Sequence, residues 1–347
     1  MTAQGRSVRS GPRSVGNHQG REVHEVTLTA EGGLQAQILT FGAVIRDLSL
    51  PLAAGGRQSL VLGFPTFDPY PVHSPYFGAL VGRYANRIGG GRFTLAGQTH
   101  VLDRNEAGTT TLHGGSGGFA TRVWDIADHS DSHVTLGLLS LDGDQGFPGT
   151  LQVTCRYTLW PDNRLEVALR ARTDRPTPVN LTQHSYFNLN GGPDVSDHVL
   201  AIHADSFTPV AHDKIPTGEI LSVAGTPFDL RQPRRLGHLA VPLDHNFVLR
   251  PPRSATSPLR PVAELTSLRA NLRLRVTTTK PGVQIYDGHM LDLAVPGLGG
   301  RPYGARAGLC IETQFFPDSP NQPQFPDTVL AAGAEYDHRT IYAFEHL

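Results

Sequence analysis

The sequence is poor in cysteine, with only Cys155 and Cys310 among its 347 residues. The two cysteines lie far apart and form no C-x-x-C pair. They predict buried thiols in a reducing compartment, and one disulfide between them stays an open alternative. A chain of this length can bury a substantial core without disulfides or metals.

Net charge and long apolar runs are also lacking. The formal net charge is −1, and because phosphate backbones demand a basic surface, this balance argues against a nucleic-acid partner. No apolar run approaches the roughly 20 residues that span a bilayer, so no membrane partner is expected. We predict a cytoplasmic protein that is either a monomer or a homodimer.

The first 20 residues are rich in Arg, Ser and Gly and lack the apolar segment of a secretory signal. We expect residues 1–20 to form a flexible tail. No linker divides the rest of the chain, because the Pro-rich runs 250–260 and 295–307 are typical of surface loops. Residues 21–347 are therefore predicted to form a single domain.

No convincing helical pattern of twelve or more residues occurs. The 38 glycines and 27 prolines are spread over the chain and imply many turns. Apolar and polar residues alternate, as in strands with one buried face, in segments 34–38, 151–159, 165–169 and 272–276. The predicted fold class is all-β, a large antiparallel β-sandwich.

The stretch 308–326 carries a carboxylate in unusual surroundings. At period two, Glu312 shares a strand face with Cys310 and Gln314, and four prolines that follow Phe316 fix the exit path. A carboxylate with mostly apolar neighbours is costly unless it has partners or a chemical task. Glu312 is a candidate catalytic residue, and a carboxylate bonded to its own loop is the alternative.

The stretch 180–188 places polar side chains on one strand face. Period two puts His184 and Tyr186 on the same face as Asn180, Thr182 and Asn188. Such a face suits a lined cleft, and an imidazole can donate or accept a proton near neutrality. His184 is a candidate proton-transfer residue, and a structural hydrogen-bonding role is the alternative.

Two Gly- and Arg-containing segments add candidate ligand contacts. Arg83 and Arg87, with Asn86 between them, could present donors to hydroxyls or a carboxylate, or could form surface ion pairs. His113 precedes a Gly-rich turn, and glycines allow a backbone to approach a ligand closely. This turn is no phosphate loop, because no Lys-Ser/Thr follows it.

Two later segments hold further polar candidates. Asp244 could accept hydrogen bonds from two sugar hydroxyls, or could make an Asx-turn. Gln284 could face a ligand or solvent. The chain has 16 histidines, but those in these segments match neither H-E-x-x-H nor a short His-x-His pair followed by Glu, so no metal is expected.

Five separated segments resemble motifs of the aldose 1-epimerase, or galactose mutarotase, family. They are residues 77–88 (FGALVGRYANRI), 112–115 (LHGG), 142–149 (DGDQGFPG), 180–188 (NLTQHSYFN) and 312–323 (ETQFFPDSPNQP). The segments follow the family's order, and the resemblance covers roughly residues 22–345. It implies a β-supersandwich with a cleft across one sheet. It also implies an isomerase that interconverts the α and β anomers of free aldohexoses such as galactose or glucose, without a cofactor.

Carried over by position, the resemblance implies Glu312 as the general base and His184 as the general acid. It implies sugar contacts for Asn86, Arg87, His113, Tyr186, Asp244 and Gln284. One segment departs from the family pattern. After Tyr286 the family commonly continues Thr-Gly-Asn, whereas this chain has Asp287, Gly288 and His289, so sugar preference is expected to differ if this segment borders the ring hydroxyls.

The implied reaction needs one base and one acid. The base removes the proton of the C1 hydroxyl while the acid protonates the ring oxygen, and after rotation about C1–C2 the ring closes on the other face. Three alternatives stay open. A hexose-phosphate mutarotase needs a cationic pocket, which Arg301 and Arg306 could supply. A non-catalytic carbohydrate-binding protein needs no matched acid and base, and a lyase or hydrolase would usually pair two carboxylates, or a tyrosine with a carboxylate.

Overall fold

The computed structural model describes residues 11–52, 55–252 and 257–347. Strands dominate it, and those of the three larger sheets pair antiparallel, which confirms the predicted all-β class. In this part of the chain the one α-helix is the single turn α1 (Tyr70–His73). None of its helices has the length and apolar character needed to cross a membrane.

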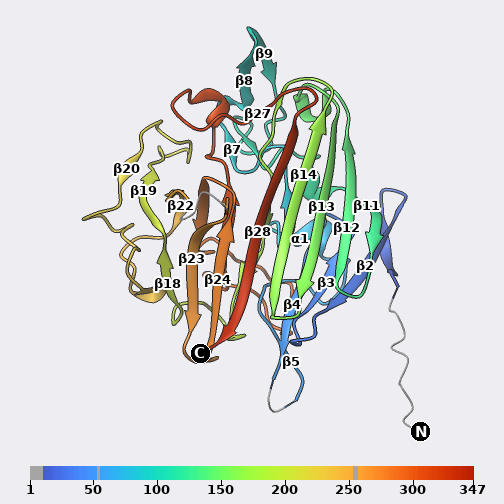
Figure 1. The fold of residues 1–347 in the computed structure, drawn as a ribbon, viewed down its shortest axis with the longest axis vertical. Helices are drawn as coiled ribbons and strands as arrows, with labels where there is room; N and C mark the ends of the chain where they lie inside the picture. The colour runs from blue at the N-terminus through green and yellow to red at the C-terminus, as the bar shows by residue number, and fades with distance from the viewer. Residues whose placement is uncertain (1–10, 53–54, 253–256) are drawn as a thin grey trace.

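The largest sheet has nine strands, and its long members lie side by side in Figure 1. In spatial order they are β11 (Asp125–His129), β12 (His133–Ser140), β13 (Leu151–Trp160), β14 (Arg164–Thr173), β28 (Glu335–His346), β24 (Leu272–Thr278), β23 (Arg260–Ser267), β18 (Val199–Ile202) and β21 (Arg234–Arg235). Segments 151–159, 165–169 and 272–276, predicted from alternation, lie within β13, β14 and β24.

Two further sheets complete the larger part of the fold. The six-stranded sheet has the order β17 (Tyr186–Phe187), β26 (Leu309–Gln314), β25 (Gly282–Tyr286), β22 (Asp244–Leu249), β19 (Ala204–Thr208) and β20 (Leu221–Ser222). The five-stranded sheet has the order β1 (Arg13–His18), β2 (Arg21–Thr29), β3 (Gln35–Leu39), β4 (Ile45–Pro51) and β5 (Arg57–Ser59).

Short elements connect these sheets. The paired strands are β6 (Ala79–Val81) with β16 (Thr182–His184), β7 (Arg87–Ile88) with β10 (Thr111–Leu112), β8 (Arg92–Leu95) with β9 (Gln98–Val101), and β15 (Thr177–Pro178) with β27 (Val329–Leu330). The 3₁₀ turns are η1 (Gly89–Gly91), η2 (Phe119–Thr121), η3 (Asp144–Gly146), η4 (Leu236–His238) and η5 (Ser319–Asn321).

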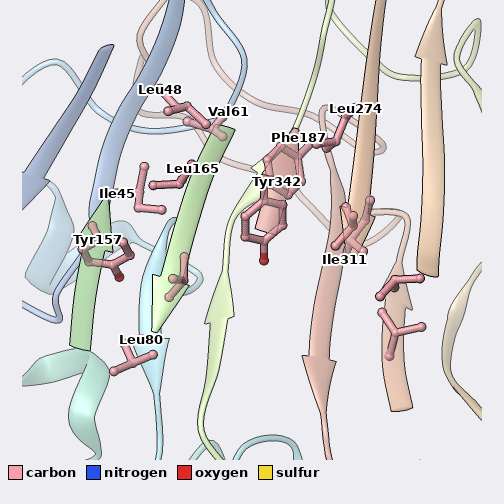
Figure 2. Packing of buried hydrophobic residues seen from close by; sticks show 14 of the residues in the cluster. Ile45, Leu48, Val61, Leu80, Tyr157, Leu165, Phe187, Leu274, Ile311 and Tyr342 are labelled. Carbon is pink, nitrogen blue, oxygen red and sulfur yellow. The ribbon is translucent and has the colours of Figure 1, made fainter. Parts of the chain in front are cut away.

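One large hydrophobic cluster joins the three sheets. It contains Leu165 and Tyr342 of the nine-stranded sheet, Ile311 and Phe187 of the six-stranded sheet, and Ile45 of the five-stranded sheet. Figure 2 shows these side chains packed together between the strands that carry them. The sheets therefore form the layers of a sandwich around a common core.

The six-stranded sheet turns one face to this core and the other away from it. On β26, Leu309 and Ile311 belong to the core cluster, so by the two-residue period Cys310, Glu312 and Gln314 lie on the opposite face. The same alternation holds on β25 and β22. The face turned away from the core thus collects the polar side chains that the sequence singled out.

The N-terminal segment differs in part from the predicted flexible tail. Residues 1–10 lie outside the described residues. Residues 13–18 form β1, which pairs with β2, and Val15 packs against a hydrophobic cluster that includes Phe41 and Phe67. An ordered strand therefore begins inside the segment expected to be flexible, because its apolar side chain and its backbone groups find partners. The single domain over residues 21–347 stays a prediction.

Other sequence predictions agree with the structure or need refinement. Cys155 and Cys310 are buried free thiols. The stretch 180–188 is not one strand: β16 and β17 are separated at Ser185 and pair with different strands, β6 and β26. Of the described residues in the predicted loops 250–260 and 295–307, Arg260 is the first residue of β23 and the others belong to no named strand.

Candidate active site

A pocket of about 310 Å³ opens on the polar face of the six-stranded sheet. All eight residues for which the sequence predicted catalytic or sugar-binding roles line it, although they come from β7, β16, β17, β22, β25, β26 and the connections around them. The pocket is also lined by Pro75, Tyr76, Glu106, Leu112, Lys214, Tyr286 and Met290.

Glu312 forms part of the pocket floor. It lies on β26 directly opposite Gln284 of β25, and the residue is only 2% exposed. Its Oε2 atom has no hydrogen-bond partner among the described residues. Burial raises the pKa of Glu312 well above its ordinary value; the charge of Asp244 adds to the rise and Arg87 opposes it. A buried, unpartnered carboxylate oxygen is suited to accept a proton or hydrogen bond from a ligand.

His184 lies next to Glu312 on the floor of the pocket. Its Nε2 atom lies 3.6 Å from Oε2 of Glu312, which is too long for a hydrogen bond, and its Nδ1 atom lies 3.6 Å from the Cys310 sulfur. Its ring is stacked with those of Tyr186 and Tyr76 at centroid distances of 5.2 and 5.8 Å. Burial lowers the pKa of His184 to about 4. A ligand oxygen placed beside this gap, on the pocket side, could therefore contact both groups.

His113 is held in one tautomer by the backbone. The amide N–H of Asn86 donates to His113 Nδ1 at 3.2 Å. Because a backbone amide can only donate, Nδ1 must accept, and the proton of the neutral ring sits on Nε2. The turn is fixed because a Cβ on Gly114, at φ +89°, would lie 2.1 Å from the carbonyl oxygen of Gly82. His113 therefore offers the pocket a hydrogen-bond donor.

This tautomer bears on metal binding. His113, His184 and Glu312 each offer one ligand atom, and these atoms lie within 4.8 Å of one another. A metal on Nε2 of His113 would move the proton to Nδ1, where it would oppose the Asn86 N–H. The cluster is thus better suited to sugar hydroxyls than to a cation. That the protein works without a metal stays a prediction.

Arg87 is fixed by a partner. Its Nε and Nη2 atoms donate to the two carboxylate oxygens of Glu106 at 2.7 and 2.6 Å. This two-point contact is the strong geometry for an arginine and a carboxylate. Asn86, in the left-handed region at φ 61°, turns its Oδ1 to the amide of Arg87, and its side-chain amide group makes no bond to the described residues.

Asp244 is also fixed on both oxygens. Gln284 Nε2 donates to Oδ1 at 2.8 Å, and Lys214 Nζ lies 3.1 Å from Oδ2. The Oε1 atom of Gln284 is buried, and no residue that the structure describes bonds to it. Lys214 stands at φ 63° in a turn whose ends are joined by a bridge between Val210 and Pro216. Gln284, Asp244 and Lys214 therefore form a row of polar side chains that bond to one another along one side of the pocket.

Tyr186 and the segment after Tyr286 border the pocket in ways that the sequence did not specify. The Tyr186 hydroxyl donates to the carbonyl of Pro75 at 3.1 Å, so its ring, stacked on His184, is the part that faces the pocket. Asp287 and His289 bond to each other at 2.7 Å and do not line the pocket. The segment borders the pocket through Tyr286 and Met290 instead.

Comparison with known proteins decides the family. The family model described as aldose 1-epimerase matches residues 24–343. The chain belongs to the aldose 1-epimerase family. The five motifs recognised in the sequence all lie within this match, which covers nearly the whole chain.

This chain is similar to named members of the family and to solved structures. It is 43% identical to a galactose mutarotase of Bos taurus over 318 residues, 90% of this chain and 91% of that one. It is 38% identical to the aldose 1-epimerase of Escherichia coli (strain K12), over 94% of this chain and 96% of that one. A GalM/aldose epimerase homologue from C. elegans superposes with a TM-score of 0.87 at 32% identity, covering 94% of this chain and 99% of that one.

Three pocket residues of this epimerase-family chain were missed by the sequence analysis. Glu106 and Lys214 sit in irregular turns, and neither has a pattern that would place it beside Arg87 or Asp244. Tyr76 precedes the recognised segment 77–88 by one residue. An aromatic residue next to a family segment is a signal that could have been followed.

The other arginines considered for ligand binding lie elsewhere. Arg83 is buried and donates to the carbonyls of Ser140, Leu141, Pro148 and Gly149, so it ties loops together. Arg301 donates to the carbonyl of Gly191, and Arg306 pairs with Asp287 at 3.3 Å. None of the three lines the pocket.

Proposed function

We propose that this protein is an aldose 1-epimerase that interconverts the α and β anomers of free aldohexoses by general acid–base catalysis. The proposal rests chiefly on the gap between Glu312 Oε2 and His184 Nε2, 3.6 Å wide on the floor of a pocket that otherwise carries hydrogen-bonding groups. Two proton-transfer groups that face each other without bonding are poised to bond a ligand placed between them.

The reaction follows from these two groups. Glu312 takes the proton of the C1 hydroxyl as His184 gives a proton to the ring oxygen, and the C1–O5 bond breaks to give the aldehyde. After rotation about C1–C2 the two transfers run in reverse on the other face of C1. Each transfer can contribute about 10²–10⁴-fold. Arg87 lies close enough to Glu312 to stabilise its ionised form.

The pKa shifts of Glu312 and His184 indicate which of the two groups holds a proton more readily. Burial raises the pKa of Glu312 and lowers that of His184, so in the free pocket the proton belongs on Glu312. This is also the state of the pair when the sugar ring is open. Sugar hydroxyls that donate to Glu312 would favour the carboxylate and shift the proton toward His184.

The charges around the pocket favour a neutral sugar over a hexose phosphate. The two cationic side chains that line it, Arg87 and Lys214, are each paired with a carboxylate. Arg301 and Arg306, the residues considered for a phosphate site, do not line it. A phosphate would therefore meet Asp244, Glu106 and Glu312 without a free cation to offset its charge.

The test is NMR exchange between anomers for a panel of free aldoses and for glucose 6-phosphate. We expect accelerated exchange of free sugars and much slower exchange of the phosphate. Binding of galactose without faster exchange would favour a carbohydrate-binding protein. Faster exchange of the phosphate than of glucose would favour a hexose-phosphate mutarotase.

A further inference from the structure

Tyr76 has a backbone conformation that tyrosine rarely adopts. Its φ is 67°, in the left-handed region that bulky residues avoid. The surrounding turn holds it there: the amide of Phe77 donates to Ser74 Oγ at 2.9 Å, and that of Ala79 donates to the carbonyl of Tyr76 at 3.0 Å. A conformation of this kind persists only where its surroundings fix it, and such residues cluster at functional sites.

The same turn is attached to the candidate acid. The amide of Gly78 donates to the carbonyl of His184 at 3.0 Å. The Tyr76 ring lies 5.8 Å from the His184 ring at an interplanar angle of 27°, and the Tyr186 ring lies 5.2 Å away at 26°. His113 meets both Tyr76 and His184 edge-on, at 4.6 and 5.1 Å. Rotation of the imidazole out of its plane would drive it against these phenol rings.

The Tyr76 hydroxyl has a different environment from that of Tyr186. Whereas Tyr186 bonds to the carbonyl of Pro75, the Tyr76 hydroxyl makes no hydrogen bond to the described residues. Tyr76 lines the pocket, and its phenol is close enough to Glu106 and Arg87 to feel their charges. The ring can hold His184 while the hydroxyl is left for a ligand.

We propose that Tyr76 is a positioning residue, whose ring fixes the plane of His184 so that Nε2 points at the ring oxygen of the sugar. The inference rests on the proposed function. Correct alignment of a proton donor matters mainly in the transition state. Loss of the Tyr76 ring should therefore lower kcat more than it raises KM. Loss of the hydroxyl alone should act mainly on KM.

The experiment compares Tyr76→Phe with Tyr76→Leu, which share the same backbone strain and differ in the ring. For Tyr76→Phe we expect kcat within about 3-fold of wild type and KM raised a few-fold. For Tyr76→Leu we expect kcat lowered at least about 10-fold, with KM changed less. The His184 ring-proton NMR shifts, assigned by their loss in His184→Ala, should move in Tyr76→Leu and stay near wild type in Tyr76→Phe.

Tyr286→Leu is the matched control, because it removes a phenol from the same pocket without a ring contact to His184. It should leave the His184 shifts in place. If Tyr76→Leu does not fold, a second pair of variants, Tyr76→His and Tyr76→Asn, makes the same comparison. Both residues tolerate the left-handed region, and only histidine keeps a flat ring. Tyr76→His should therefore retain kcat better than Tyr76→Asn.

Three results would overturn the inference. They are an unimpaired kcat in Tyr76→Leu, equal kcat losses in the Phe and Leu variants, and equal kcat values in the His and Asn variants. Each of these requires a wild type that exchanges anomers. A wild type with no exchange on any aldose would instead overturn the proposed function, and the inference with it.

Discussion

Strand β26 has a buried polar cluster on each of its faces, and the two clusters differ in how their polar atoms are satisfied. On the pocket face, Glu312 Oε2, Gln284 Oε1 and both amide atoms of Gln314 have no hydrogen-bond partner in the described part of the chain. On the core face, Thr313 Oγ1 bonds to Thr340 Oγ1 at 2.6 Å, and Thr340 bonds to Thr278 at 3.0 Å.

The polar cluster on the core face extends to a buried lysine. Lys280 is 1% exposed, and its amine bonds to the Tyr336 hydroxyl and lies over the rings of Phe315 and Tyr336, at 4.8 and 4.2 Å. The Tyr336 oxygen accepts hydrogen bonds from the Lys280 amine and from the amide N–H of Leu181. Burial lowers the pKa of Lys280 well below its ordinary value.

The contrast shows that a displaced pKa alone does not mark an active site. Both clusters contain strongly shifted groups, since burial lowers the pKa of His338, beside Lys280, to about 2. In the Lys280 cluster the protein supplies the partners. In the Glu312 cluster an acceptor next to an open pocket is left for a ligand. Four predictions test this difference, from the largest expected effect to the smallest.

Glu312→Gln should lower kcat about 10²–10⁴-fold without lowering the urea midpoint, because it removes a buried carboxylate and keeps the shape. Thr313→Val, the neighbouring residue on the other face, should do the reverse: it should cost about 1 kcal/mol of unfolding free energy and leave kcat within a few-fold. Anomer exchange by NMR and urea unfolding measure both. If Glu312→Gln kept its kcat, the base assignment would be wrong.

His184→Ala should lower kcat about 10²-fold or more and raise KM much less, because it removes the acid but few of the sugar contacts. Steady-state kinetics over a range of galactose concentrations separate the two parameters. A variant with raised KM and normal kcat would mean that His184 binds sugar without transferring a proton.

Lys280→Met should stabilise the protein at pH 7 and leave exchange rates unchanged. In the unfolded chain the lysine is protonated below its ordinary pKa of 10.5, whereas burial lowers its pKa well below that value in the folded protein. Stability is therefore lost as pH falls from 10.5, by about 1.4 kcal/mol per pH unit until the folded pKa is reached. The gain in the variant should be larger at pH 7 than at pH 9. Equal gains by urea unfolding at both pH values would mean that Lys280 is charged in the folded state.

Treatment with EDTA should leave the exchange rate unchanged, because the His113 tautomer presents a proton rather than a lone pair to the pocket. The same assay after dialysis measures it, with buffer-dialysed protein as the control. A loss of activity that zinc restores would show that His113, His184 and Glu312 hold a metal after all.

Periodicity predicted the strands and the faces of Glu312 and His184, because a two-residue repeat is a local property of the chain. It could not predict which arginine enters the pocket. Arg83 and Arg87 lie in one segment, but the backbone changes direction at Asn86, with φ 61°, and sends them to different places. It also could not pair Arg87 with Glu106 or Asp244 with Lys214, since these contacts depend on how loops meet in space.

The placement of the pocket residues has a consequence for how sugar preference can change. Glu312 stands on β26, where Leu309 and Ile311 belong to the core cluster, and His184 ends β16, which pairs with β6. Their positions are therefore tied to the stability of the fold. Lys214 and Met290, whose Nζ and sulfur lie 3.5 Å apart, stand on turns at the pocket rim. Substitutions in these turns can be selected for a new aldose while the chemistry stays in place. Directed evolution of this scaffold should begin there.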